Sequence, residues 1–185
     1  YLGLFQQVDA DCARISGFTP TSFWLGINSR AWGFQEGHAR RLILSLFADA
    51  LQSKNIFKSE ILNRTLIPFG VTGNRSASAV RAPSDAKVVR REVLRLVKRY
   101  GRVPVTLRKI HEHTYDWDSL FREIDPQGEV FDVQFLENTE FFDRYYKRNL
   151  AVFMVGANVT RNDPFEVLSF FRSKDLVNLS GISAN

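Results

Sequence analysis

Residues 85–101 read DAKVVRREVLRLVKRYG, and this stretch determines the fold that the sequence predicts. Ser84 and Asp85 are residue types that cap the start of a helix. Apolar side chains then recur at helical spacing, at Ala86, Val89, Val93, Leu96, Val97 and Tyr100. Gly101 stands where a glycine in the left-handed conformation ends many helices. The pattern predicts a helix over residues 86–100.

Residues 104–124 follow this helix and predict two further helices. Pro104 is suited to the first turn of a helix, so a second short helix is expected from Val105 to about His113. Asp116 or Asp118 can cap a third helix that includes residues 119–124.

Residues 125–136 predict a turn and then a strand. Asp125-Pro126-Gln127-Gly128 is composed of turn-forming residues. From Glu129 to Leu136, apolar and polar side chains alternate, as expected for a half-buried strand. The apolar run 150–155 is the expected antiparallel partner of this strand.

The order helix, tight turn, helix, helix, strand, strand resembles a LOTUS (OST-HTH) winged helix over residues 86–135. The likeness rests on the first helix at 88–98, the Gly-Arg-Val-Pro turn at 101–104, the helix at 119–124 and the strand at 128–133. Members of that family are non-enzymatic modules that bind RNA or partner proteins. The resemblance therefore implies a winged-helix unit with a binding function.

The rest of the chain extends this unit into an α+β fold that is mostly helical, with a small antiparallel sheet. We expect five regions in this order: an irregular aromatic arm at 1–35, a helical pair at 36–69, a basic linker at 70–84, the winged-helix-like unit at 85–156, and a C-terminal helix and tail at 157–185. Within the helical pair, apolar spacing predicts helices at 36–53 and 56–68.

Length and composition exclude several classes of protein. The chain has 185 residues, of which 44% are hydrophobic, so it can bury a core without disulfides. Cys12 is the single cysteine, which excludes an intramolecular disulfide framework. No apolar run approaches the length of a membrane-spanning helix.

Charge is segregated along the chain. Residues 64–109 contain 12 basic and two acidic residues, whereas residues 111–143 contain one basic and 10 acidic residues. Such a basic block attracts phosphate groups. The alternatives are that the acidic block pairs with it inside the fold, or that it meets an acidic protein surface.

The candidate RNA contacts are basic side chains and neighbouring aromatic rings. The basic ones position a protein on phosphates, and the rings can stack on unpaired bases. The candidates are Arg90, Arg91, Arg95, Lys98, Arg99, Arg102, Arg108, Lys109, Tyr145, Tyr146, Lys147 and Arg148. A separate set of rings in the N-terminal arm is expected to bind partner proteins: Phe18, Phe23, Trp24 and Trp32.

Catalysis and metal binding have weaker support. His111, His113, Asp116 and Asp118 are ligand types, but two histidines two positions apart diverge on a helix. The sequence contains no phosphate-binding loop and no Gly-x-Ser-x-Gly elbow. We expect no enzyme, no cofactor and no metal site; a nuclease that uses these four residues remains an alternative.

The leading hypothesis is a non-enzymatic, RNA-associated subunit of a ribonucleoprotein such as a mitochondrial ribosome. It rests on the basic block, the abundance of arginine and a first residue, Tyr1, that is not methionine. The mitochondrial matrix or another organelle interior is the expected location. The alternative is a structural subunit of a large organellar or viral protein assembly that makes no contact with nucleic acid.

Overall fold

The computed structural model describes residues 21–53 and 85–158 and has an α+β fold, which confirms the predicted class. The elements, in chain order, are β1 (Thr21–Ile27), α1 (Gly37–Ser53), α2 (Ala86–Tyr100), β2 (Val103–Arg108), the short 3-10 helix η2 (Lys109–His111), α3 (Trp117–Ile124), β3 (Phe131–Leu136), α4 (Asn138–Tyr146) and β4 (Val152–Asn158). Cys12, Phe18, the expected helix at 56–68, the basic linker and the C-terminal tail lie outside the described residues.

The strands form one mixed sheet in the order β1-β4-β2-β3. β2 is parallel to β3, with Val103 opposite Phe131, and is parallel to β4 on its other side. β1 is antiparallel to β4, with Trp24 opposite Val155. The sheet thus has three parallel strands and one antiparallel edge strand.

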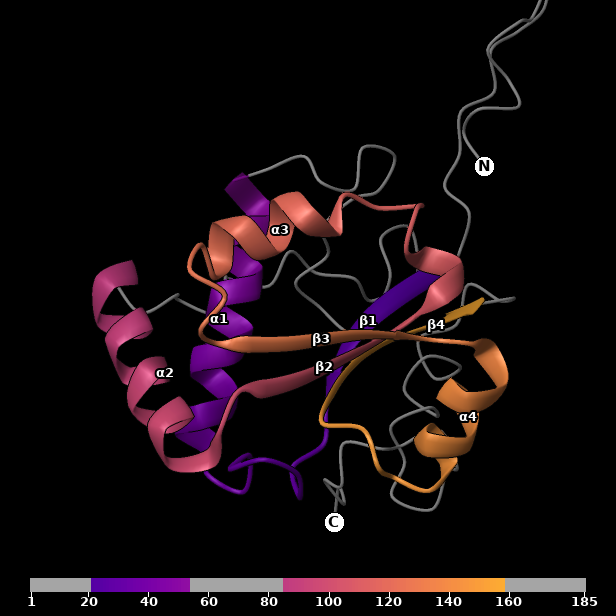
Figure 1. The fold of residues 1–185 in the computed structure, drawn as a ribbon, viewed down its shortest axis with the longest axis horizontal. Helices are drawn as coiled ribbons and strands as arrows, with labels where there is room; N and C mark the ends of the chain where they lie inside the picture. Colours follow the sequence, from indigo (N-terminus) through magenta and orange to yellow (C-terminus); the bar gives the residue numbers. More distant parts are fainter. Residues whose placement is uncertain (1–20, 54–84, 159–185) are drawn as a thin grey trace, which may run out of the picture.

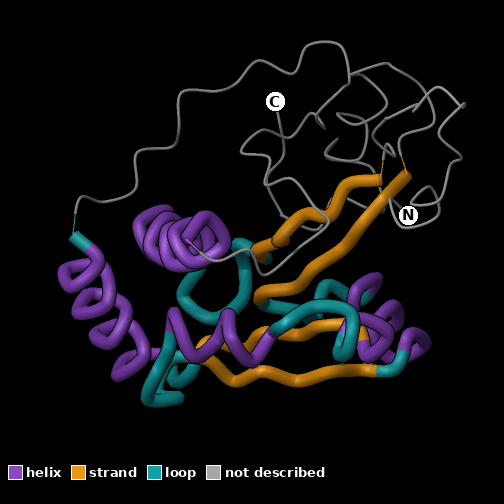
Figure 2. The backbone as a smooth tube through the Cα atoms, turned by 90° about the horizontal axis from the view of Figure 1, so that it is seen from above, coloured by secondary structure: helices purple, strands orange, loops and turns teal. Residues whose placement is uncertain are grey.

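Helices cover both faces of this sheet (Figure 1). Val103, Val105 and Leu107 of β2 lie in the main core, which also contains apolar side chains of α1, α2 and α3. Phe153 of β4 packs on the opposite face, in a second cluster with Phe141 and Tyr145 of α4. α2 and α4 therefore cover different parts of the molecule, and they lie at opposite ends of it in both Figure 1 and Figure 2.

The helix boundaries expected from capping residues are confirmed. The Asp85 side chain accepts a hydrogen bond from the Lys87 backbone N–H at 2.8 Å. Gly101 ends α2 with φ 81°, and its N–H donates to the Val97 carbonyl. Asp116 caps α3 by accepting from the Ser119 N–H at 3.0 Å. α1 also matches the helix expected at 36–53.

The expected helix over 105–113 is wrong, because residues 103–108 form the central strand β2. Valine and threonine favour strands, and β2 is covered on both faces, so its side chains show no clear polar alternation. Pro104 fits because pairing with β4 begins only at Val105. A proline there interrupts no hydrogen bond to β4.

The winged-helix expectation and the antiparallel sheet are also wrong. β4 does not pair with β3; it pairs with β1 and β2, and the β2-α3-β3 segment is a parallel strand-helix-strand unit. The segment expected to separate two wing strands contains α4. Residues 21–27, in the arm expected to be irregular, form β1. The division into five regions stays a prediction.

None of the helices in residues 21–53 and 85–158 is long and apolar enough to cross a bilayer.

Candidate functional site at the carboxyl edge of the sheet

The carboxyl ends of β2, β3 and β4 meet at one edge of the sheet, because these strands are parallel. β1 is antiparallel to β4, so it begins at this same edge. In open sheets of this kind, ligands bind in the crevice outside the carboxyl ends of the strands. We call this region the carboxyl edge and consider it first as a binding site.

The connections that leave this edge diverge after β2 and β3. The chain leaves β2 toward α3, which packs in the main core, and leaves β3 toward α4, which packs on the other face. Such a divergence between neighbouring parallel strands is a topological switch point and opens a crevice between the two loops. The residues after β2 and β3 are therefore the first candidates for a binding site on this sheet.

Two polar contacts connect the segments that follow β2 and β3. Arg108 donates from Nε to the Asn138 side-chain oxygen at 2.9 Å. The Lys109 ammonium donates to the Glu137 carboxylate at 2.7 Å. These contacts join the end of β2 to the start of α4, and they place a guanidinium, an ammonium, a carboxylate and an amide at one position.

The hydrogen bond from Lys109 to Glu137 raises the pKa of Lys109 above its usual value of 10.5, and the charge of Glu137 acts in the same direction. Both side chains are more than half exposed to solvent. A solvated ion pair of this kind makes a modest contribution to stability.

Aromatic rings lie beside the polar pairs. Phe23, near the start of β1, packs edge-on against His111 at 5.6 Å and against Tyr115 at 6.4 Å between ring centroids. Trp117 packs against Tyr115 at 5.6 Å and donates from its indole N–H to the His111 carbonyl. Phe23, His111 and Tyr115 are only partly buried, so they offer ring surface to a ligand.

The side chains of α4 extend this surface on the other face of the sheet. The Arg108 guanidinium carbon lies 5.1 Å from the Phe142 ring centroid. Tyr146 stacks on Phe142 at 6.1 Å and is 60% exposed. Cationic, amide and aromatic groups from β1, β2, η2 and α4 thus meet around the carboxyl edge.

Most of the basic side chains predicted to bind RNA lie elsewhere or are engaged within the protein. Arg90, Arg91, Arg95, Lys98 and Arg99 belong to α2. Arg91 and Arg95 both lie near the Glu92 carboxylate, at 3.8 Å and 2.7 Å. Arg99 pairs with Glu36 at 3.4 Å, and Arg102 donates to the Phe131 carbonyl.

Several of the predicted residues in and after α4 and in the arm are likewise engaged within the protein. Tyr145 is buried in the second cluster, Lys147 pairs with Asp143, and Arg148 accepts a hydrogen bond at its carbonyl from the Asn28 side chain. Of the partner-binding rings, Trp24 lies within β1, Trp32 donates to the Gly101 carbonyl at 2.8 Å, and Phe23 is at the carboxyl edge. Their role in partner binding stays a prediction.

The candidate metal ligands do not converge. Within residues 21–53 and 85–158, no three His, Cys, Asp or Glu side chains are placed to hold a metal ion. Asp116 caps α3 and Asp118 lies 3.9 Å from Arg122. The nuclease alternative required convergence of His111, His113, Asp116 and Asp118, so this geometry does not support it.

The sequence alone did not identify Glu137, Asn138, His111 and Tyr115 as parts of the carboxyl edge. The signal was present: polar or charged residues directly follow each of the segments 103–108 and 131–136. It becomes readable only once residues 103–108 are recognised as a strand, because only then do two parallel strands end together.

Comparisons with known proteins identify related folds but no family. No protein-family model matches the sequence, and no curated protein matches it. Solved structures do match. The murein tripeptide binding protein MppA of Escherichia coli aligns with a TM-score of 0.65 and 13% identity, covering 89% of this chain and 34% of that one.

Two further structures extend this likeness. OppA of Haemophilus influenzae, in complex with the peptide RPPGFSPFR, aligns with a TM-score of 0.67 and 13% identity, covering 89% of this chain and 34% of that one. A peptide-binding protein of a peptide ABC transporter aligns with a TM-score of 0.63 and 17% identity, covering 88% of this chain and 79% of that one. The chain thus has the fold of a part of such proteins. It spans about a third of the length of MppA and OppA.

These likenesses overturn the functional hypothesis drawn from the sequence. The LOTUS resemblance is wrong, because the matched structures are peptide-binding proteins and because β2, α3 and β3 of this chain form a parallel strand-helix-strand unit. The RNA partner and the ribonucleoprotein subunit are wrong as well, and so is the alternative of a structural subunit of a large protein assembly. The mitochondrial location is likewise wrong, since one matched protein is described as periplasmic. The matched proteins are described as binding proteins rather than enzymes.

Proposed function

We propose that this chain is part of a non-enzymatic protein that binds short peptides at the carboxyl edge of its sheet. The observation that carries the proposal is the fold likeness to several peptide-binding proteins, with TM-scores of 0.63 to 0.67 over 88–89% of the chain in the three structures described above. A shared fold does not by itself give a function. The chemistry of the carboxyl edge is the second line of support.

The groups at this edge match those that a peptide presents. A peptide offers a terminal ammonium, a terminal carboxylate and backbone N–H and C=O groups. Glu137 can accept from an ammonium, Arg108 and Lys109 can pair with a carboxylate, and the Asn138 amide can both donate and accept. The partly buried rings of Phe23 and Tyr115 provide apolar surface for side chains.

The test is a binding titration of the purified chain with the nonapeptide RPPGFSPFR and with trialanine, each carrying a fluorescent label. Arg108→Gln and Asn138→Ala remove groups from the carboxyl edge, and each is expected to weaken binding of at least one peptide by about tenfold, as the loss of a charge-assisted hydrogen bond does. Arg122→Gln is the control, because Arg122 is 80% exposed on α3.

The expected outcome is saturable binding that the two edge variants weaken and the control does not. Circular dichroism establishes that each variant is folded. Failure of both peptides to bind, or equal binding by all variants, would contradict the proposed function.

A further inference from the structure

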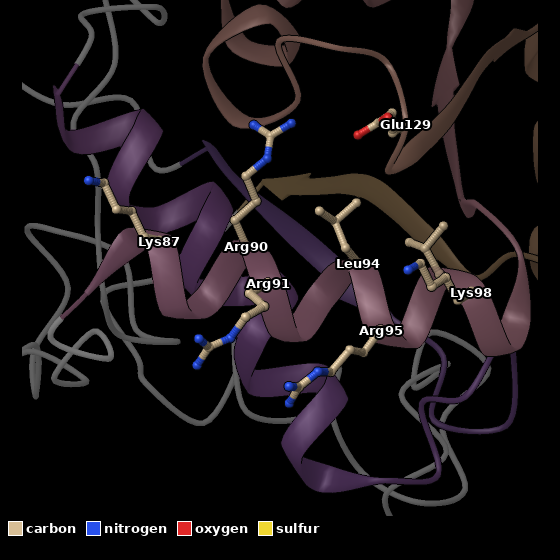
Figure 3. A pocket seen from close by; sticks show the side chains of 8 residues that line it. Lys87, Arg90, Arg91, Leu94, Arg95, Lys98 and Glu129 are labelled. Atoms are coloured by element: carbon tan, nitrogen blue, oxygen red, sulfur yellow. The ribbon is translucent and has the colours of Figure 1, made fainter.

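A groove of about 720 Å³ follows α2, remote from the carboxyl edge. Seven of its eight lining residues belong to α2, and Glu129 forms the opposite wall (Figure 3). They are Lys87, Arg90, Arg91, Leu94, Arg95, Val97, Lys98 and Glu129. We call this feature the α2 groove. Because α2 ends where β2 begins, the α2 groove lies toward the amino ends of the parallel strands.

The lining of the α2 groove is strongly cationic. It contains five basic side chains, against the carboxylates of Glu129 and of Glu92 beside it. Glu92 is occupied by Arg91 and Arg95. Among the described residues, no carboxylate lies within 4 Å of Lys87 or Lys98, so the groove keeps an excess of positive charge that nothing described neutralises.

The cations are arranged in a line. Lys87, Arg91 and Arg95 are four residues apart, and Lys98 follows three residues later. In an α-helix these four positions fall within about 80° of the circumference and rise by about 6, 6 and 4.5 Å. They form one ridge along the groove, about 16 Å long.

The apolar residues lie on the adjoining flank. In Figure 3, Arg90 and Leu94 point toward the wall that carries Glu129, whereas Arg91 and Arg95 point the other way. Leu94 and Val97 are half-buried and form the apolar part of the lining. The result is a recess with apolar side chains beside a cationic ridge.

We propose that the α2 groove docks an extended, acidic segment of a partner protein. In an extended chain, alternate side chains lie on one side and repeat every 6.6 Å or so, close to the ~6 Å repeat of the cations. Carboxylates at alternate positions can therefore pair with Lys87, Arg91 and Arg95 in succession. The intervening side chains then point away from the cationic ridge.

The α2 groove is a different surface from the proposed peptide site, so either proposal can fail without the other. Binding to the α2 groove is electrostatic and is expected to weaken as salt rises. None of the residues that form the pairs at the carboxyl edge, Arg108 with Asn138 and Lys109 with Glu137, lines the α2 groove.

The probe is the labelled peptide acetyl-Ser-Asp-Ser-Asp-Ser-Asp-Ser-amide, and its Asn counterpart is the neutral control. The test variant is Lys87→Gln/Arg91→Gln/Lys98→Gln, which leaves the contact between Arg95 and Glu92 in place. The matched variant Arg122→Gln/Arg144→Gln/Lys147→Gln removes the same charge from ion-paired surface positions on and next to α3 and α4.

We expect the acidic peptide to bind the unchanged chain and the matched variant with equal affinity. Its affinity for the test variant should be about tenfold lower, because two of the proposed ion pairs, those of Lys87 and Arg91, and the neighbouring charge of Lys98 are lost. The Asn peptide should bind the unchanged chain about tenfold more weakly than the acidic peptide does. Amide resonances of Leu94 and Val97 should shift with the acidic peptide in the unchanged chain, which tests the site without any variant. The nonapeptide RPPGFSPFR should bind the test variant as it binds the unchanged chain.

Three results would overturn the proposal. One is an equal loss of affinity for the acidic peptide in the test and matched variants, which would show a general effect of net charge. Another is the absence of resonance shifts at Leu94 and Val97. The third is that vesicles containing 30% phosphatidylserine, or a single-stranded RNA of seven nucleotides, bind at least as tightly with the same dependence on the three α2 cations.

Discussion

Asp125 shows how one side chain sets the geometry that precedes β3. Its carboxylate is buried and accepts hydrogen bonds from the backbone N–H groups of Glu129, Val130 and Phe131 at 2.9, 2.8 and 3.0 Å. The turn from α3 into β3 is thereby fixed, and with it the start of the strand that pairs with β2.

We predict that Asp125→Ala lowers the free energy of unfolding by about 3 kcal/mol, because it leaves several buried donors without an acceptor. Asp125→Asn keeps one oxygen and should cost less. Urea unfolding followed by circular dichroism measures both. A loss of less than 0.5 kcal/mol or so for the alanine variant would contradict this account of the turn.

Gly101 shows a different constraint at the residue scale. Its φ of 81° and ψ of −177° lie in a region that is essentially restricted to glycine, and a Cβ there would meet no atom within 4 Å. We predict that Gly101→Ala costs about 1–3 kcal/mol through backbone strain alone. Gly37→Ala is the control: Gly37 is the first residue of α1, and alanine favours a helix. Equal unfolding midpoints for the two variants would show that Gly101 is not strained.

The Lys109–Glu137 pair predicts a pH dependence. The pKa of Lys109 is raised in the folded chain by its hydrogen bond to Glu137, so the folded state holds this proton more tightly than the unfolded state. The pair's contribution is therefore complete below pH 10.5, the usual value, and is lost as the pH rises through the higher folded pKa. Tyr100 acts in the same direction, because its hydrogen bond to Glu36 raises its pKa above 10.0.

We predict that stability falls between pH 10 and 12 or so, and falls less in Lys109→Gln, which lacks this proton. Urea unfolding at a series of pH values measures both slopes. Identical slopes in the two proteins would contradict a stabilising Lys109–Glu137 pair.

At the scale of elements, α4 joins the carboxyl edge to the core. Phe141 is fully buried and packs against Phe142 and Tyr145, whereas Tyr146 on the same helix is mostly exposed. α4 positions Asn138 and Phe142, which contact Arg108. The helix is thus the support for one side of the proposed peptide site.

We predict that Phe141→Ala lowers the free energy of unfolding by about 3–5 kcal/mol, as large deletions in a core do, and that Tyr146→Ala changes it by less than 0.5 kcal/mol or so. Peptide affinity provides the second readout. Tyr146→Ala should weaken peptide binding without loss of stability, whereas a stable Tyr146→Ala chain with unchanged affinity for both peptides would exclude Tyr146 from the site.

At the scale of the whole molecule, the sequence predicted individual elements better than their arrangement. The caps at Asp85 and Asp116 and the alternation in 131–136 gave α2, α3 and β3, because these signals are local. Residues 103–108 gave no such signal, since a strand covered on both faces lacks alternation. That one error turned a strand-helix-strand unit into a winged helix.

Identifying the candidate site from the sequence also depended on recognising residues 103–108 as a strand. Arg108 and Lys109 were selected from their charge alone and assigned to phosphate. Glu137 and Asn138 are 28 and 30 residues away from Lys109 and Arg108, and only the parallel register of β2 and β3 brings the four together. A non-local pairing of this kind cannot be read from charge or local periodicity.

The central claim is that the carboxyl edge of the sheet binds peptides, and amide resonance mapping with RPPGFSPFR tests it most directly. Titration of the isotope-labelled chain reports every backbone N–H at once. The account predicts that the largest shifts fall in residues 108–115 and 136–142, with little change over 87–98. No shifts at saturating peptide, or shifts confined to α2, would contradict it.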